Sequence, residues 1–357
     1  MATDLLTAEM TAAGLRGIRQ TNDRAADDVR VASDGGGTDG AGECSGKTSP
    51  VSCDAEQSVA AEVTASVWSV QLGDVVELTK PRIVVMILVT TLATAMIGAG
   101  GWVSVVDLFW LLLATAAVAG SAGAANQVWE RVIDQRMTRT ANRPLPAGRL
   151  STGLAATVAG SLGLLGTALL FQLFGFVPAA VGLATWVLYV LVYTPMKTRT
   201  AWNTTVGAVA GALPVMIGYT ATGGGVGDFA GWLLVGVLVA WQYPHFMAIA
   251  WMYRRQYAEA GFRMTTTVEP TGRSAGWQSI VGSLALIFCG VAHCLLSGSL
   301  AASLLASLGV ILSTWPMLKA SVRFAKLPDD GRARRLLRSS LLVLPAVLAI
   351  ATLQLFW

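Results

Sequence analysis

Long uncharged apolar runs recur along the chain from Ile83 to its end. Each holds roughly 18 or more residues, enough to cross a hydrocarbon core about 30 Å thick. The sequence is 54% hydrophobic and only 13% charged, a balance that indicates a membrane protein. Because a helix satisfies its own backbone hydrogen bonds in lipid, the predicted fold class is an all-α bundle of about nine transmembrane helices. The predicted spans are Ile83–Gly101, Val105–Ala125, Leu150–Leu170, Gly175–Tyr193, Thr204–Ala221, Phe229–Trp251, Trp277–Leu296, Leu300–Leu318 and Leu337–Phe356.

From Lys80 onward, every Lys and Arg except Arg338, near the start of the ninth span, lies in alternate connections between the predicted spans. They lie before the first span and after the second, fourth, sixth and eighth. By the positive-inside rule, the basic connections and the N-terminus are predicted to be cytoplasmic. The other connections have no Lys or Arg, near Gly101, Phe174, Gly224 and Ser297.

The first 63 residues differ from the rest in composition. They include the stretch SDGGGTDGAGECSGKTS and carry more acids than bases. Such a segment is predicted to be disordered, which leaves residues 64–357 as the polytopic domain. The tail has no apolar core of a signal peptide, and its acids argue against a transit peptide. We therefore expect a multi-pass protein of a bacterial plasma (inner) membrane, with the lipid bilayer rather than nucleic acid around it.

One stretch, NQVWERVIDQRMTRTANRPLPAGR, concentrates charge between two apolar spans. Its side chains Asn126, Glu130 and Asp134 are spaced by four, so they stack on one helix face if the second helix continues past Ala125. Three converging oxygen ligands suit Mg²⁺, which completes its coordination with water and substrate phosphate. The alternative is an amphipathic helix end whose acids pair with Arg131 and Arg139.

The arginines that follow favour a phosphate ligand. Arg139, Arg143 and Arg149 lie in a return stiffened by two prolines, and guanidinium groups match phosphate oxygens. Carboxylates that bind a metal, next to arginines that bind phosphate, form a site suited to a diphosphate. Membrane topology alone also explains any single one of these arginines.

Two further stretches lie on the same predicted side, YTPMKTRTAWN and WQYPHFMAIAWMYRRQYAEAGFRM. The three stretches are expected to roof one cavity. His245 falls inside the sixth span, where an ionisable group is a functional candidate because its burial in lipid is costly. A neutral imidazole bonded to a neighbouring helix is the alternative.

Together these stretches resemble the intramembrane prenyltransferase superfamily, over the chain from Glu77 to the last span. The resemblance rests on LTKPRI, RVIDQRMTRTANRPLPAGR, YTPMKTRTAWN, GALPVMIGY, WQYPHF and YAEAGFRM in this order. The superfamily's Asn-Asp-Asp motif reads Asn126, Glu130 and Asp134 here, with Glu in place of the usual Asp. A second acidic motif is weaker, because Gln256 stands beside Tyr257 where related chains commonly have an acid.

These phrases are most similar to the branch of the superfamily that prenylates haem. The resemblance implies that farnesyl diphosphate and haem B are joined, with water, to give haem O and diphosphate. It further implies Mg²⁺ on the Asn126, Glu130 and Asp134 set, and a haem A synthase as a reasonable pathway partner. The predicted substrate-binding residues are Lys80, Arg82, Arg139, Arg143, Tyr193, Lys197, Arg199, His245 and Tyr257.

Two alternatives stay open from the residues. A sibling enzyme that prenylates a different aromatic acceptor, such as a quinone precursor, needs the same three oxygen ligands. A transporter also uses intramembrane polar groups, but it usually places them near the bilayer midplane. The concentration of charge at one face favours an enzyme.

Overall fold

The computed structural model describes residues 72–296 and 299–356. The predicted disordered tail and its boundary near residue 63 lie outside these residues. The long elements are α3 (Pro81–Ala99), α4 (Val105–Asp134), α5 (Thr152–Phe174), α6 (Phe176–Val187), α8 (Asn203–Ala212), α9 (Pro214–Ala221), α10 (Phe229–Met252), α13 (Arg273–Leu295), α14 (Leu300–Lys326) and α15 (Asp330–Leu353). Shorter ones are the π-helix η1 (Leu188–Tyr193), α7 (Thr194–Met196), α11 (Arg254–Glu259), α12 (Thr265–Val268) and the 3₁₀ turn η2 (Gln354–Phe356).

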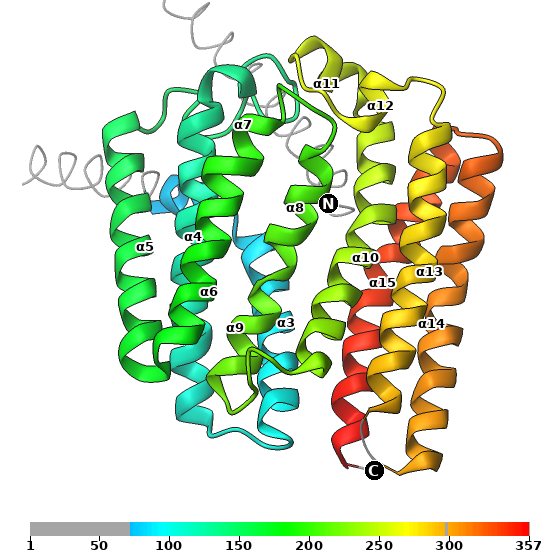
Figure 1. Cartoon of the computed structure of the whole chain (residues 1–357). Coiled ribbons are helices and arrows are strands. Elements are labelled where there is room, and N and C mark those ends of the chain that lie inside the picture. The colour runs from blue at the N-terminus through cyan, green and yellow to red at the C-terminus, as the bar shows by residue number, and fades with distance from the viewer. Residues whose placement is uncertain (1–71, 297–298, 357) are drawn as a thin grey trace, which may run out of the picture. The chain divides into compact units, whose positions relative to one another are not determined.

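Nine helical spans in the described part of the chain are long and apolar enough to cross a membrane, which confirms the predicted all-α architecture. The fourth span combines α6, η1 and α7, and the fifth combines α8 and α9 around Pro214. Successive spans run up and down (Figure 1). The packing closes into a ring, because α3 contacts α4, α9 and α15, while α10 contacts both α8 and α15.

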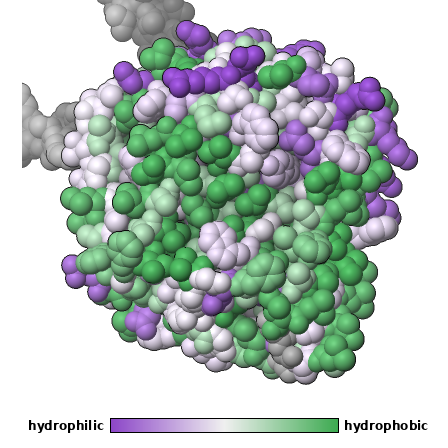
Figure 2. All heavy atoms as spheres, viewed as in Figure 1, coloured by the Kyte–Doolittle hydropathy of each residue, from purple (hydrophilic) through white to green (hydrophobic). Residues whose placement is uncertain are grey.

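Large apolar side chains cover the outside of the bundle between its two polar ends. Figure 2 shows a hydrophobic band with hydrophilic groups gathered mainly at one rim. Leu164 and Phe288 are among the exposed residues of this band. Such side chains lose nothing by facing hydrocarbon, whereas polar backbone there must be bonded within a helix.

The basic connections all lie at one end of the bundle, here called the basic end. They are residues 135–151 between α4 and α5, 197–202 between α7 and α8, and 253–272 between α10 and α13. The α14–α15 junction at residues 327–329 lies at the same end, and its cations are on the adjoining ends of the two helices. In Figure 1, α7, α11 and α12 mark this end. Local capping helps to fix it: the side chains of Ser151 and Asp329 accept hydrogen bonds from the first turns of α5 and α15.

Candidate active site at the basic end

The three predicted ligand residues lie on the inner face of α4. The helix runs unbroken to Asp134, so the expected stacking of residues four apart occurs. Asn126, Glu130 and Asp134 are 0%, 4% and 1% exposed. A helix end that merely faced water would leave its carboxylates exposed, so this face serves something inside the bundle.

Each of the three side chains contacts a cation from a different segment. Lys80, just before α3, donates to Oδ1 of Asn126. Lys197, after α7, places Nζ 2.7 Å from Oε1 of Glu130. Arg143 places Nη1 2.7 Å from Oδ2 of Asp134. The cations differ from Arg131 and Arg139, which the amphipathic interpretation paired with these acids.

Lys80 is held in place by its backbone and by close packing. It is the one non-glycine residue with positive φ in the described part of the chain (φ 57°), a conformation that costs about 1–3 kcal/mol. A Cβ at Gly123 of α4 would lie 3.0 Å from the carbonyl oxygen of Thr79, so a larger residue there would require this turn to move away by a few tenths of an ångström. The close approach of this turn to α4 allows the Lys80 amine to reach the side chain of Asn126.

The π-helix η1 supplies two aromatic rings to the site. Tyr189 and Tyr193 have ring centroids 5.3 Å apart, and Lys197 Nζ lies 4.7 Å from the ring of Tyr193. Thr194 accepts from Nδ2 of Asn126 at 3.0 Å and donates to the carbonyl oxygen of Tyr189 at 2.9 Å. Sequence reasoning missed Tyr189 and Thr194, because nothing in the apolar run marks where a helix widens.

The basic connections are tied to one another across the site. Arg139 Nη2 lies 3.3 Å from the hydroxyl of Tyr257 on α11, and its guanidinium lies 4.7 Å from the ring centroid of Tyr253. The backbone N–H of Arg263 donates to the carbonyl oxygen of Lys197 at 2.7 Å. The three charged stretches therefore contact one another beside the α4 residues.

The site carries more cations than carboxylates, and this excess acts on Lys80. Burial, followed by the charges of Arg143 and Lys197, lowers the pKa of Lys80 to about 7. Burial also opposes the charged form of Lys197, but the Glu130 carboxylate outweighs it and raises the pKa of that lysine. An anion bound among these groups would relieve their repulsion.

The oxygen set fits a divalent cation. Oδ1 of Asp134 is buried without a hydrogen-bond partner in the described residues, and the neighbouring ligands are carboxylate and amide oxygens, which Mg²⁺ prefers. Across the site, Oε1 of Gln256 is likewise buried and without a partner, whereas Glu259 is exposed. A buried acceptor without a donor is costly unless something positive reaches it.

Three predicted residues are not among the side chains described above. The side chains of Arg82 and Arg199 are exposed. His245 stacks on Trp241 with ring centroids 4.8 Å apart and lies 3.0 Å from Oγ of Ser340 on α15. Because that hydroxyl donates to the carbonyl of Leu337, the network assigns the proton to Nδ1 of His245 and leaves Nε2 with a lone pair.

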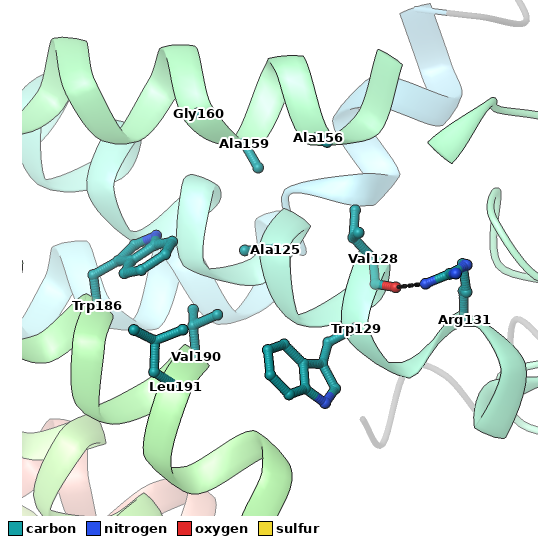
Figure 3. Close-up of a pocket in the computed structure, with 10 residues that line it drawn as sticks. All are labelled: Ala125, Val128, Trp129, Arg131, Ala156, Ala159, Gly160, Trp186, Val190 and Leu191. Carbon is teal, nitrogen blue, oxygen red and sulfur yellow. Dashed lines mark hydrogen bonds between the residues drawn. The ribbon is translucent and has the colours of Figure 1, made fainter. Parts of the chain in front are cut away.

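A pocket of 540 Å³ lies elsewhere, between α4, α5 and the α6–η1 span. In the close-up of Figure 3, Trp129, Trp186 and Leu191 line it together with small residues of α5. Asn126, Glu130 and Asp134 are not among its lining residues. Apart from Arg131, the residues that line it are mostly apolar, so the pocket is suited to hydrocarbon.

Known proteins share both the sequence and the fold. A protein of Rhodopirellula baltica called protoheme IX farnesyltransferase is 60% identical over 283 residues, which are 78% of this chain and 99% of that relative. A second, from Solibacter usitatus and with the same name, is 39% identical over 292 residues, 79% of this chain and 99% of the relative.

Solved structures agree in fold at low identity. A UbiA homologue from Archaeoglobus fulgidus bound to GPP and Mg²⁺ matches with TM-score 0.60 and 15% identity, covering 78% of this chain and 99% of that one. A digeranylgeranylglyceryl phosphate synthase matches with TM-score 0.66 and 12% identity, covering 80% and 98%. The sequence model of the UbiA prenyltransferase family matches residues 87–344. These matches confirm the resemblance drawn from the motifs, and the chain belongs to the UbiA prenyltransferase family.

Proposed function

We propose that this chain transfers the farnesyl group of farnesyl diphosphate to a vinyl group of haem B, with addition of water, giving haem O and diphosphate. The observation that carries the prenyl-transfer chemistry is the buried row of three oxygen ligands on α4, each contacted by a cation from a different segment. The haem acceptor is supported by relatives called protoheme IX farnesyltransferase.

The chemical step is the departure of an allylic diphosphate. Asn126, Glu130 and Asp134 would hold Mg²⁺, which when bound supplies Lewis-acid neutralisation of the leaving group. Lys80, Arg143 and Lys197, which contact those side chains, would bind and neutralise the diphosphate oxygens. Arg139 is the further cation in reach of this region; no nucleophilic side chain is needed.

The aromatic groups are proposed to act in the second part of the reaction, in which the allylic cation reacts with haem. Loss of diphosphate leaves an allylic cation. The rings of Tyr189 and Tyr193, which lie beside Lys80 and Lys197, would stabilise this cation. The electron pair of the haem vinyl group forms the new carbon–carbon bond. Water adds to the resulting cation and releases a proton, which leaves a hydroxyethylfarnesyl substituent.

The haem would bind between this site and α10. His245 offers Nε2 as a ligand for the iron, since its Nδ1 is engaged by Ser340. Tyr257 lies where it contacts both Arg139 and the apolar cluster of Met137 and Phe262. Arg82 and Arg199, exposed at the same end, would act on approach of the anionic substrates.

We further propose that the chain resides in a bacterial plasma membrane with the basic end cytoplasmic, where farnesyl diphosphate is supplied. The Lys and Arg distribution supports this orientation. Haem O would pass to an enzyme that oxidises it, and a haem A synthase is the corresponding partner.

Product analysis tests the proposal. Purified protein is incubated with haem B, farnesyl diphosphate and Mg²⁺, and EDTA is added to a parallel sample. The haem products are separated by chromatography and identified by mass spectrometry. A farnesylated, hydrated haem that disappears with EDTA supports the proposal. Diphosphate release with a quinone precursor, and none with haem, would instead support the sibling enzyme.

A further inference from the structure

A second basic cluster lies outside the candidate active site, at the junction of α14 and α15. A pocket of 330 Å³ opens there. Four of its lining residues are cations and none is acidic; the full lining is Trp315, Pro316, Lys319, Ala320, Arg323, Arg332, Arg335 and Ser339. The proposed farnesyl transfer uses none of them.

The charges in this pocket are largely uncompensated. Arg332 contacts Asp329 and donates to the carbonyl oxygen of Leu327 at 3.2 Å. Within the described residues, however, the side chains of Arg323 and Arg335 make no ion pair or hydrogen bond, and Lys319 contacts only the ring of Trp315. By contrast, the cations around α4 each have an oxygen partner. The described part of the protein therefore provides no anion for Arg323 and Arg335.

The surface next to the pocket favours a lipid as the source of that anion. On α14, Trp315, Lys319 and Arg323 follow one another at intervals of four, so they form one stripe. Toward the bilayer centre this stripe continues as exposed Leu308 and Leu312. On α15, Leu342 is 76% exposed one turn beyond Ser339. Cations above and exposed hydrocarbon below match a phosphate headgroup with acyl chains.

The pocket also lies at the depth expected for a headgroup. It is at the basic end, where α14 ends at Lys326 and α15 begins at Asp330. Tryptophan is enriched at the membrane–water interface, and Trp315 is half exposed at the pocket wall. Basic pockets between transmembrane helices on this side are suited to anionic lipids.

We propose that the α14–α15 pocket binds the phosphate of an anionic phospholipid, with Arg323 and Arg335 as its main ligands. Lys319 and Arg332 complete the positive rim, and the acyl chains lie along the exposed leucines. This site is separate from the farnesyl transfer reaction and does not depend on it.

Native mass spectrometry of the full chain in detergent tests the site, with phosphatidylglycerol as the probe and phosphatidylcholine as the neutral comparison. Phosphatidylglycerol is expected to bind more tightly. A variant carrying Arg323→Gln and Arg335→Gln should bind it about 25-fold more weakly, since each cation near an anionic headgroup contributes roughly fivefold. A matched variant with Arg334→Gln and Arg338→Gln removes the same charge from α15 outside the pocket and should bind as the unaltered chain does.

Equal losses in both double variants would overturn the proposal, since they would indicate general charge attraction rather than a pocket. Displacement of phosphatidylglycerol by equimolar glycerol 3-phosphate would also overturn it, because a free phosphate would then satisfy the site. A second measurement uses phosphatidylglycerol with brominated acyl chains, which quenches nearby tryptophan. The part of the quenching that disappears in a Trp315→Phe variant is the signal from Trp315. This part should also disappear in the Arg323→Gln and Arg335→Gln variant. If it remained there, the assignment of the lipid to this pocket would be contradicted.

Discussion

Glu130 and Lys197 form an ion pair with their charged atoms 2.7 Å apart, and their side chains are 5% and 13% exposed. The pair joins the end of α4 to the segment after α7. The pair therefore positions Glu130, a proposed metal ligand, and also holds two segments of the site together. Experiments can separate these two roles.

Replacing Lys197 with Met should destabilise the protein, because it leaves the Glu130 carboxylate buried without its partner. Loss of one member of such a pair costs about 3–5 kcal/mol. The double variant Lys197→Met with Glu130→Gln should recover most of that loss, although not activity. Thermal unfolding in detergent measures both, and a double variant as unstable as the single one would contradict a buried ion pair.

Asp134→Asn should lower turnover about 100- to 1,000-fold while leaving folding largely intact. The amide keeps the shape of the side chain but removes the charge proposed to hold Mg²⁺ and, through it, the leaving group. Initial rates of diphosphate release, compared with the unfolding temperature, separate chemistry from stability. Near-normal turnover would remove Asp134 from the metal site.

Arg143→Ala should weaken binding of a non-reactive farnesyl diphosphate analogue, by roughly tenfold or more, since a charge-assisted contact to phosphate is lost. Arg149 provides the control: it lies in the same connection but pairs with Asp74 and Glu77 instead. Arg149→Ala should leave analogue affinity nearly unchanged. If Arg143→Ala altered only haem affinity, the proposed places of the two substrates would be reversed.

His245→Ala should reduce haem affinity without changing affinity for the diphosphate analogue. Ser340→Ala should produce a smaller change in the same direction, because the imidazole keeps its lone pair but loses the partner that fixes its tautomer and orientation. Absorbance titration with haem B follows both variants. An unchanged titration with His245→Ala would make His245 a packing residue between α10 and α15.

The fold was largely predictable from the sequence. A hydrocarbon solvent leaves a chain few ways to satisfy its backbone, so apolar runs of sufficient length already indicated nine helices and their alternating direction. The boundaries shifted where helices continue beyond the hydrophobic run. Thus α4 extends from the predicted end at Ala125 to Asp134, and α15 begins at Asp330 rather than at Leu337.

The candidate site was only partly predictable. The spacing of Asn126, Glu130 and Asp134 placed them on one face, because helical geometry is local. Their partners come from distant segments, so only the packed chain decided that Lys80, Lys197 and Arg143 meet them. The left-handed turn at Lys80 and the π-helix that presents Tyr189 depend on close contacts with α4 and leave no periodic signal. Sequence by itself determined the helices and the chemistry they carry, whereas tertiary packing decided which charges face one another, since pairing across a bundle depends on approach between segments far apart in the chain.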